Sequence, residues 1–281
     1  MDSAHAHRRL DTAAHRRLDV DNPLRFDVVT LFPDFFTSPL AASLTGRALK
    51  RQIASVHLTN PRDFTTDKHH KVDDIPYGGG VGMVMKPEPI FAAIESLPQL
   101  PRREVVLLTP QGQTMDQPLF KELATQYDQL VLICGHYEGV DERVLNVVTR
   151  EVSLGDFVLT GGEIPALALI NGVIRLRPGT VGKADSLKYE SFETDLLDYP
   201  QYTRPTQFRD WAVPEVLRSG DHGAIAQWRH QQQIERTQSR RPDLFERWQA
   251  RAKTGPSQHR PSPHSAPQSL PHPSSHSPLD P

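Results

Sequence analysis

Between residues 24 and 182, short apolar runs alternate with stretches whose apolar residues recur every three or four positions. The runs predict strands, and the stretches between them predict helices. The predicted strands are residues 26–31, 54–59, 104–109 and 130–133. The predicted helices are one that carries Leu40, Leu44 and Leu49, followed by 87–97 and 118–126. This alternation is typical of an α/β domain with a parallel sheet and helices on both faces.

A further strand and a helix are expected after residue 152. The apolar run Phe157–Leu159 lies between two glycine-bearing turns and predicts a brief buried strand. Thr160 and Glu163 have the spacing of a capping box, so a helix should begin near Gly161. Residues 164–174 are apolar on almost every face, which predicts a helix buried in the core or against another chain.

Three of the predicted strands run into glycine-bearing loops, at 109–112, 135–139 and 160–162. In open α/β sheets, ligands bind beyond the carboxyl ends of the strands, so these loops predict a shared pocket, although the glycines around 155–162 could also form only a structural turn. They offer backbone groups more than fixed charges, which suits an adenine edge and an aliphatic tail better than a pyrophosphate. Phe32-Pro-Asp34, with no glycine, follows the first strand, which argues against a dinucleotide fold.

A long polar segment, residues 60–82, follows the second strand. Its length favours a glycine-hinged lid near the pocket, with a solvated loop as the alternative. The residues that could reach phosphates are Arg62, Lys68, His69 and Lys71. Adjacent histidines (His69, His70) and adjacent aspartates (Asp73, Asp74) lack the spacing of a rigid metal site, so no tightly held metal is predicted.

The two ends differ from the rest of the 281 residues in composition. Residues 1–22 and 254–281 have too few apolar residues to build a core, and both are expected to be disordered. The first segment lacks the apolar stretch of a signal peptide, and no run reaches the length of a membrane span. The single cysteine, Cys134, excludes an internal disulfide and fits a reducing, cytoplasmic compartment.

The segment 204–253 is basic, with ten Lys or Arg against six Asp or Glu, whereas the whole chain carries a net charge of −2. Asp221 is expected to cap a helix whose polar side leaves Arg229, His230 and Arg236 for phosphates. A local basic surface of this kind predicts contact with RNA, or else simple solvation. The three tryptophans of this part are expected in its core more than on a base-stacking surface; they are Trp211, Trp228 and Trp248.

Five motifs together resemble the bacterial tRNA (guanine-N1-)-methyltransferase family over residues 24 to 250. They are PYGGGVGM at 76–83, LTPQG at 108–112, GHYEGVDER at 135–143, LGDFVLTGGE at 154–163 and LLDYPQYTRP at 196–205. The resemblance implies a parallel α/β sheet with a deep trefoil knot of the SPOUT type, which is exceptional among folds, and a small C-terminal helical domain. The expected organisation is a disordered extension 1–22, a knotted domain 23–182, a linker 183–191, a helical tRNA-binding domain 192–253 and a disordered tail 254–281.

The same resemblance implies that the chain is an S-adenosylmethionine-dependent enzyme that methylates N1 of the guanosine immediately 3′ of the anticodon (position 37) in tRNA. It also implies a homodimer in which each active site uses both subunits. Relatives need Mg²⁺, but no ligand set in this sequence gives it a site. The implied donor-binding residues are Leu107, Leu108, Thr109, Pro110, Gly135, Tyr137, Glu138, Leu154, Gly155, Asp156, Phe157, Val158, Leu159, Gly161, Gly162 and Pro165.

The chemistry asks for a base and a cation as well. Guanine N1 carries a proton at neutral pH that a base must remove, and a cation stabilises the charge that then gathers on O6. Arg175 matches the arginine of the family, although a cation there could also serve only the helix dipole. The family has an aspartate before a Ser-Phe pair, whereas this chain has Glu190, which is the predicted base. Asp185 and Asp195 are the alternatives.

Two other functions remain open from the sequence. A knotted methyltransferase acting on another RNA, for instance at a ribose hydroxyl, would not need Arg175 and Glu190. A non-catalytic RNA-binding protein could also retain the knot. A second departure from the family pattern, Asn171 in place of an acid, has no assigned consequence.

Overall fold

The computed structural model of the chain describes residues 23–182 and 190–254. The chain divides after Glu193 into two compact units. The two ends predicted to be disordered lie outside the described residues, with the exception of Thr254. Most of the predicted linker, residues 183–189, lies outside them as well.

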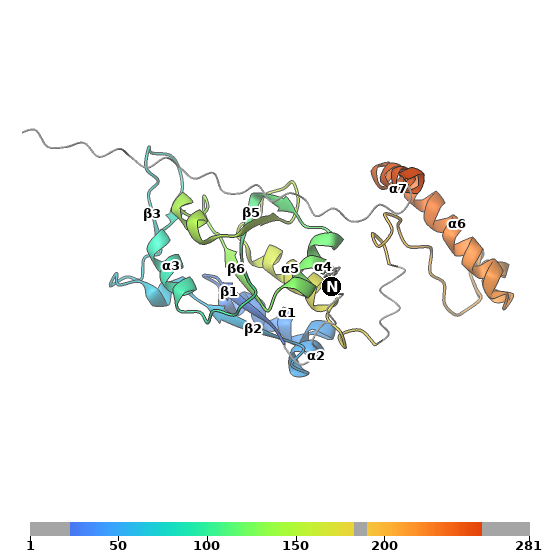
Figure 1. Cartoon of the computed structure of the whole chain (residues 1–281), viewed down its shortest axis with the longest axis horizontal. Helices are drawn as coiled ribbons and strands as arrows, with labels where there is room; N and C mark the ends of the chain where they lie inside the picture. Colours follow the sequence, from blue (N-terminus) through green and yellow to red (C-terminus); the bar gives the residue numbers. More distant parts are fainter. Residues whose placement is uncertain (1–22, 183–189, 255–281) are drawn as a thin grey trace, which may run out of the picture. The chain divides into compact units, whose positions relative to one another are not determined.

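The first unit contains a five-stranded sheet in which all neighbouring strands are parallel, so the predicted α/β class is confirmed (Figure 1). The strand order is β2-β1-β6-β5-β7. The strands are β1 (Leu24–Val29), β2 (Ala54–Thr59), β5 (Arg103–Thr114), β6 (Gln129–Cys134) and β7 (Arg150–Ser153). The pairing of β5 with β7 is interrupted between Leu108 and Gln113 and then continues to Thr114 and Ser153. Residues 109–112, predicted as a loop after the strand, therefore form a bulge within β5.

Helices cover both faces of this sheet (Figure 1). Successive side chains of a strand point to opposite faces, so the strands contribute apolar residues to two separate cores. In β6, Leu130 and Leu132 face one core while Val131 and Ile133 face the other. The first core packs against α2 (Ser43–Lys50), α4 (Gln117–Gln126) and α5 (Glu163–Ile174). The second packs against α3 (Pro87–Glu95) and the 3-10 turns η2 (Pro61–Phe64) and η3 (Glu142–Val147).

The helix predicted through Leu40, Leu44 and Leu49 is wrong in one respect, because it is broken in two. A 3-10 turn, η1 (Pro33–Phe36), leads into α1 (Thr37–Ala41), and α2 follows after Ala42. Ala42 has extended backbone angles, and Ser43 has a positive φ of 54°. The chain therefore turns between the two apolar stretches that helical spacing had joined.

The predicted strand at Phe157–Leu159 is also wrong. The fifth strand is β7, which ends at Ser153, and Phe157 and Val158 are 54% and 84% exposed. A tight turn takes the chain away from the sheet, since Phe157 N donates to Gly155 O at 2.9 Å. The three apolar side chains thus lie at the surface, where no neighbouring strand of the described chain pairs with them.

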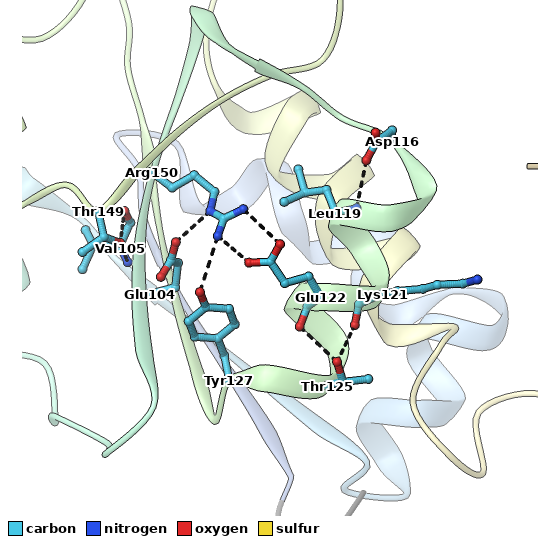
Figure 2. A network of polar contacts seen from close by, with 10 residues as sticks. All are labelled: Glu104, Val105, Asp116, Leu119, Lys121, Glu122, Thr125, Tyr127, Thr149 and Arg150. Atoms are coloured by element: carbon cyan, nitrogen blue, oxygen red, sulfur yellow. Dashed lines mark hydrogen bonds and ion pairs between the residues drawn. The ribbon is translucent and has the colours of Figure 1, made fainter. Parts of the chain in front are cut away.

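A polar network fastens β7 to β5 and α4 (Figure 2). Arg150 Nε donates to Glu104 Oε1 at 2.8 Å, and Arg150 Nη2 donates to Glu122 Oε1 at 2.5 Å. Burial of the Tyr127 phenol raises its pKa to about 12, and the negative charge of Glu104 acts in the same direction. β7 is short and begins with charged residues. The contacts of Arg150 therefore hold β7 in the sheet, as packing of apolar side chains holds the other strands.

The second unit combines two helices with a small hairpin. Strands β8 (Gln207–Phe208) and β9 (Trp211–Ala212) are antiparallel, and η5 (Glu215–Arg218), α6 (His222–Arg240) and α7 (Pro242–Thr254) follow. Asp221 caps α6 as predicted, since Oδ1 accepts from Gly223 N at 2.9 Å and from Ala224 N at 3.0 Å.

The prediction that the tryptophans lie in the core of this unit is wrong for Trp211, which is 66% exposed on the two-residue strand β9. None of the described helices is both long and apolar enough to span a membrane.

Candidate active site

A cavity of about 430 Å³ lies beside residues 107–111 of β5 and at the carboxyl ends of β6 and β7. Residues of all three predicted glycine-bearing loops contribute to its wall, although 109–112 is a bulge within β5 and not a loop after it. The residues named from the sequence that line it are Leu107, Leu108, Thr109, Pro110, Gly135, Tyr137, Glu138, Leu154, Phe157, Val158, Leu159, Gly161, Gly162 and Pro165. Gly155 and Asp156 belong to the same loop but are not part of the wall.

Several lining residues were not named individually from the sequence, although four of them lie in the three predicted loops. They are Gln111, His136, Gly139, Val140, Glu142, Leu145, Glu151, Val152, Ser153 and Thr160. Glu151 to Ser153 belong to β7, whose short and charged sequence gave no strand signal. His136 could have been found, because it lies inside the glycine-bearing loop 135–139.

The loops approach one another closely enough to require glycine. Gly162 N donates to Gly135 O at 3.0 Å, and a Cβ on Gly162 would lie 2.6 Å from the Cα of Cys134. A Cβ on Gly161 would collide with the imidazole of His136. Since a side chain at either position would force backbone or ring apart, these glycines set the shape of the cavity wall.

Glu163 does not act in the predicted capping box; α5 is preceded by Gly162 and has no side-chain cap. Instead the buried Glu163 carboxylate accepts from Thr30 Oγ1 at 2.7 Å and contacts His136 Nε2 at 2.7 Å. The Phe32 ring lies against His136, with centroids 4.7 Å apart. The carboxylate therefore joins the end of β1, the loop after β6 and the first turn of α5 beside the cavity.

Cys134 is the last residue of β6 and is buried. Burial raises the pKa of its thiol well above the usual range, and the charge of Glu163 adds to the shift. A thiol held protonated and out of water is a poor nucleophile, so Cys134 serves packing rather than chemistry.

Arg175 caps the C-terminus of α5, at the end of the helix as predicted. Its Nη2 donates to both carboxylate oxygens of Glu190, at 2.6 Å each. About a third of each side chain is exposed, 30% and 33% respectively. The structure thus brings together the two residues named for catalysis, with a donor and an acceptor side by side at the surface of the first unit.

The alternative bases are placed differently. Asp185 lies outside the described residues. Asp195 is buried in the second unit, where its carboxylate pairs with Arg251 Nη1 at 2.7 Å. Asn171, the other departure from the family pattern, donates from Nδ2 to Thr45 Oγ1 at 2.9 Å, which ties α5 to α2.

The segment 60–82 reaches the cavity through the hairpin that ends it. β3 (Asp73–Asp74) pairs with β4 (Val84–Met85), and Met85 N donates to Gly139 O at 2.9 Å. The four glycines between the strands, at positions 78, 79, 80 and 82, all have positive φ angles. No cluster of three or more His, Cys, Asp or Glu that could hold a metal occurs within residues 23–182 and 190–254.

The glycine-walled cavity lies in the region of a parallel sheet where α/β proteins bind small ligands. The same unit presents a paired arginine and carboxylate suited to proton transfer. The chain belongs to the tRNA (Guanine-1)-methyltransferase TrmD family, whose sequence model matches residues 24–247. The resemblance inferred from the motifs is thereby confirmed.

Three similar proteins, each named tRNA (guanine-N(1)-)-methyltransferase, illustrate the relationship. The protein of Acaryochloris marina is 72% identical over 232 residues, which are 82% of this chain and 99% of the relative. The protein of Gloeothece citriformis is 75% identical over 226 residues, 80% of this chain and 98% of the relative. The protein of Synechocystis sp. PCC 6803 is 75% identical over 228 residues, 81% of this chain and 98% of the relative.

Proposed function

We propose that this chain transfers a methyl group from S-adenosylmethionine to N1 of the guanosine immediately 3′ of the anticodon in tRNA. The family match and the names of the relatives support a tRNA (guanine-N1)-methyltransferase. The single observation that carries the finer proposal is the Arg175–Glu190 pair, because its donor and acceptor complement the O6 and N1–H of guanine.

The main cavity suits the methyl donor. Its charged lining residues, among those described, are Glu138, Glu142 and Glu151, with no lysine or arginine. A wall of backbone groups and carboxylates favours a cationic sulfonium over a pyrophosphate. When bound, the donor supplies an electrophilic methyl carbon, and the residues of the cavity hold and orient it.

The two catalytic residues then have separate tasks. Glu190 takes the proton from N1 when that nitrogen is methylated; the bound donor would supply the methyl group and would leave as the neutral thioether. Arg175 donates to O6, where negative charge collects, and loss of one such donor typically costs about 3–4 kcal/mol of barrier. Without RNA, Arg175 donates to Glu190. In the proposed complex the guanine edge inserts between the two side chains, so that Arg175 donates to O6 and Glu190 accepts from N1–H.

The assembly is proposed to be a homodimer with shared sites. Phe157, Val158 and Ile164 are exposed at the rim of the cavity or directly beside it, and contiguous exposed apolar residues are typical of an interface. A partner subunit that covers them would exclude water from the reaction.

The chain path is proposed to be the trefoil knot of the SPOUT type. Residues after β7 return beside the loop after β6, as the bridge between His136 and Gly161 indicates. The proposed organisation is a knotted donor-binding domain at 23–182, a linker at 183–191 and a tRNA-binding domain at 192–253, active in the cytoplasm, where bacterial tRNA is located.

Incubation of the purified chain with isotope-labelled S-adenosylmethionine and an unmodified tRNA transcript tests the proposal. We expect label on guanine N1, identified by nucleoside chromatography and mass spectrometry. A matched transcript with adenosine in place of the target guanosine should remain unlabelled. Label on a ribose, or on a different nucleotide, would replace the proposed reaction with that of another knotted methyltransferase, and no label at all would favour a binding protein.

A further inference from the structure

A second cavity, of about 320 Å³, lies within the unit that begins at Thr194. Its wall is formed by residues of the segment 199–206, by Val213, by η5 and by the first half of α6. The volume is at the lower end of the range for small-molecule pockets, and it suits a single nucleotide.

The charge of this cavity is entirely positive. Arg204 and Arg229 are its only charged lining residues among those described, and no carboxylate contributes to the wall. Neither arginine forms an ion pair with a described carboxylate, unlike Arg241 and Arg251 of the same unit. Since a guanidinium offers a planar set of donors that fits phosphate oxygens, two such guanidiniums in one wall favour an anion with phosphate geometry.

Aromatic faces accompany these cations. The Arg229 guanidinium lies over the ring of Tyr199, 4.7 Å from its centroid. Tyr202 is about half exposed, and its ring centroid is 6.4 Å from that of Trp228. Aromatic rings and stacked guanidiniums are the surfaces on which unstacked RNA bases are bound, so the cavity combines phosphate donors with a stacking surface.

We propose that this cavity binds one nucleotide of the tRNA substrate, with its phosphate on Arg204 and Arg229 and its base against Tyr202. The proposal rests on the proposed function, since it takes tRNA as the substrate. The nucleotide differs from the methylated guanosine, which the Arg175–Glu190 pair receives. The cavity is thus a binding site that anchors the RNA and takes no part in methyl transfer.

Binding of fluorescein-labelled, unmodified tRNA to the full chain tests this site by anisotropy at several salt concentrations. We expect Arg204→Ala/Arg229→Ala to raise the Kd about tenfold or more and to lower the salt slope by about one to two. Tyr202→Ala should weaken binding, and Tyr202→Phe should retain it because the stacking ring remains. Arg247→Ala, which removes one exposed arginine of α7, is the matched control and should bind as the unaltered chain does.

Steady-state kinetics separate anchoring from catalysis. For the double variant we expect a raised KM for tRNA with kcat and S-adenosylmethionine affinity unchanged, and a thermal melt checks that the unit is folded. A Kd and KM equal to those of Arg247→Ala would overturn the site. Loss of dimerisation by the double variant in sedimentation, with unchanged tRNA affinity, would also overturn the site. That result would assign the cavity to contact with a second copy of the chain. If the unaltered chain bound tRNA without methylating it, the proposed function would fail while the binding comparison still decided this site.

Discussion

At the scale of single residues, Arg175 and Glu190 form an ion pair at the surface of the first unit. Both side chains are about one-third exposed, so water screens the pair and its net contribution to stability is small. A weak pair can be opened at little cost by a substrate edge that satisfies both partners. The Glu190 side chain is long enough for both of its carboxylate oxygens to accept from the guanidinium.

Glu190→Gln tests the assignment of the base. The amide keeps the size of the side chain but cannot take the N1 proton, so kcat should fall about 100-fold or more. Calorimetric titration should show unchanged affinity for S-adenosylmethionine, because Glu190 is not part of the donor cavity. Glu193→Gln is the matched control, since Glu193 is a nearby carboxylate that binds Gln117 and Lys121. Turnover close to normal in Glu190→Gln would move the role to Asp185 or Asp195.

Glu163→Ala tests the buried carboxylate between Thr30 and His136. Removing it leaves the buried Thr30 hydroxyl without its acceptor, and a cavity beside it, so the free energy of unfolding should fall by about 2–4 kcal/mol. Glu163→Gln retains an acceptor and a donor of the same shape and should cost much less. Urea unfolding of both variants measures the difference. Equal stabilities for the two would show that the hydrogen bonds at this position contribute little.

At the scale of elements, the strands that are stabilised by apolar packing were predicted from the sequence. The strand that is stabilised mainly by ion pairs, β7, was missed. β1, β2, β5 and β6 carry apolar side chains toward two cores, so their pattern was visible. β7 has only Val152 and Ser153 buried, and its fixation by Arg150 depends on Glu104 and Glu122, which are distant in sequence. An opposite error arose at Phe157–Leu159, where apolar residues line a cavity and the surface instead of a core.

The candidate site was predictable where it is built from glycine loops and not where it depends on tertiary contacts. Loop 135–139 and Gly161–Gly162 stood out because close backbone approach requires glycine. Glu163 was misread as a helix cap because local spacing cannot show that Thr30 and His136 would compete for its carboxylate.

Tyr127 provides a pH test of the Arg150 network (Figure 2). Its pKa is raised from 10.0 to about 12, first by burial and then by the charge of Glu104. The folded state therefore favours the neutral phenol; this stabilisation is complete below pH 10 and is lost as the pH rises through 12. Absorbance titration at about 295 nm should show one of the six tyrosines ionising late, and Tyr127→Phe should remove that step. A single transition near pH 10 in the unaltered chain would contradict the raised pKa.

Gly162→Ala tests the backbone contact between the loops after β6 and before α5. The added methyl group would meet the backbone of Cys134, so the wall must move, and donor affinity should fall about tenfold or more. Gly182→Ala is the matched control, because nothing lies within 4 Å of the position that its Cβ would take. Equal calorimetric affinities of the two variants for S-adenosylmethionine would show that the cavity tolerates the displacement.

At the scale of the whole molecule, charge is divided along the chain. Residues 204–253 sum to +4 while the full chain sums to −2, so the remaining residues sum to −6. The cavity lined by three glutamates lies in the acidic part, and the second cavity with its two arginines lies in the basic part. The local charge of residues 204–253 thus favours a polyanion, although the net charge of the molecule would repel it.

Subunit mixing tests whether one dimeric site draws its donor loops and its catalytic pair from different chains. Gly162→Ala damages the loops and leaves Arg175–Glu190 intact, whereas Glu190→Gln does the reverse. If the sites are shared, a mixed dimer contains one site with intact loops from one subunit and an intact pair from the other. An equal mixture, unfolded and refolded together, should then regain about a quarter of the normal activity, because half of the dimers are mixed and each has one working site of two. The measurement is the initial rate of methylation. The concentration of S-adenosylmethionine is kept below the raised KM of Gly162→Ala for this donor, and each variant refolded alone is the control. A mixture no more active than its components would mean that every chain builds its own complete site.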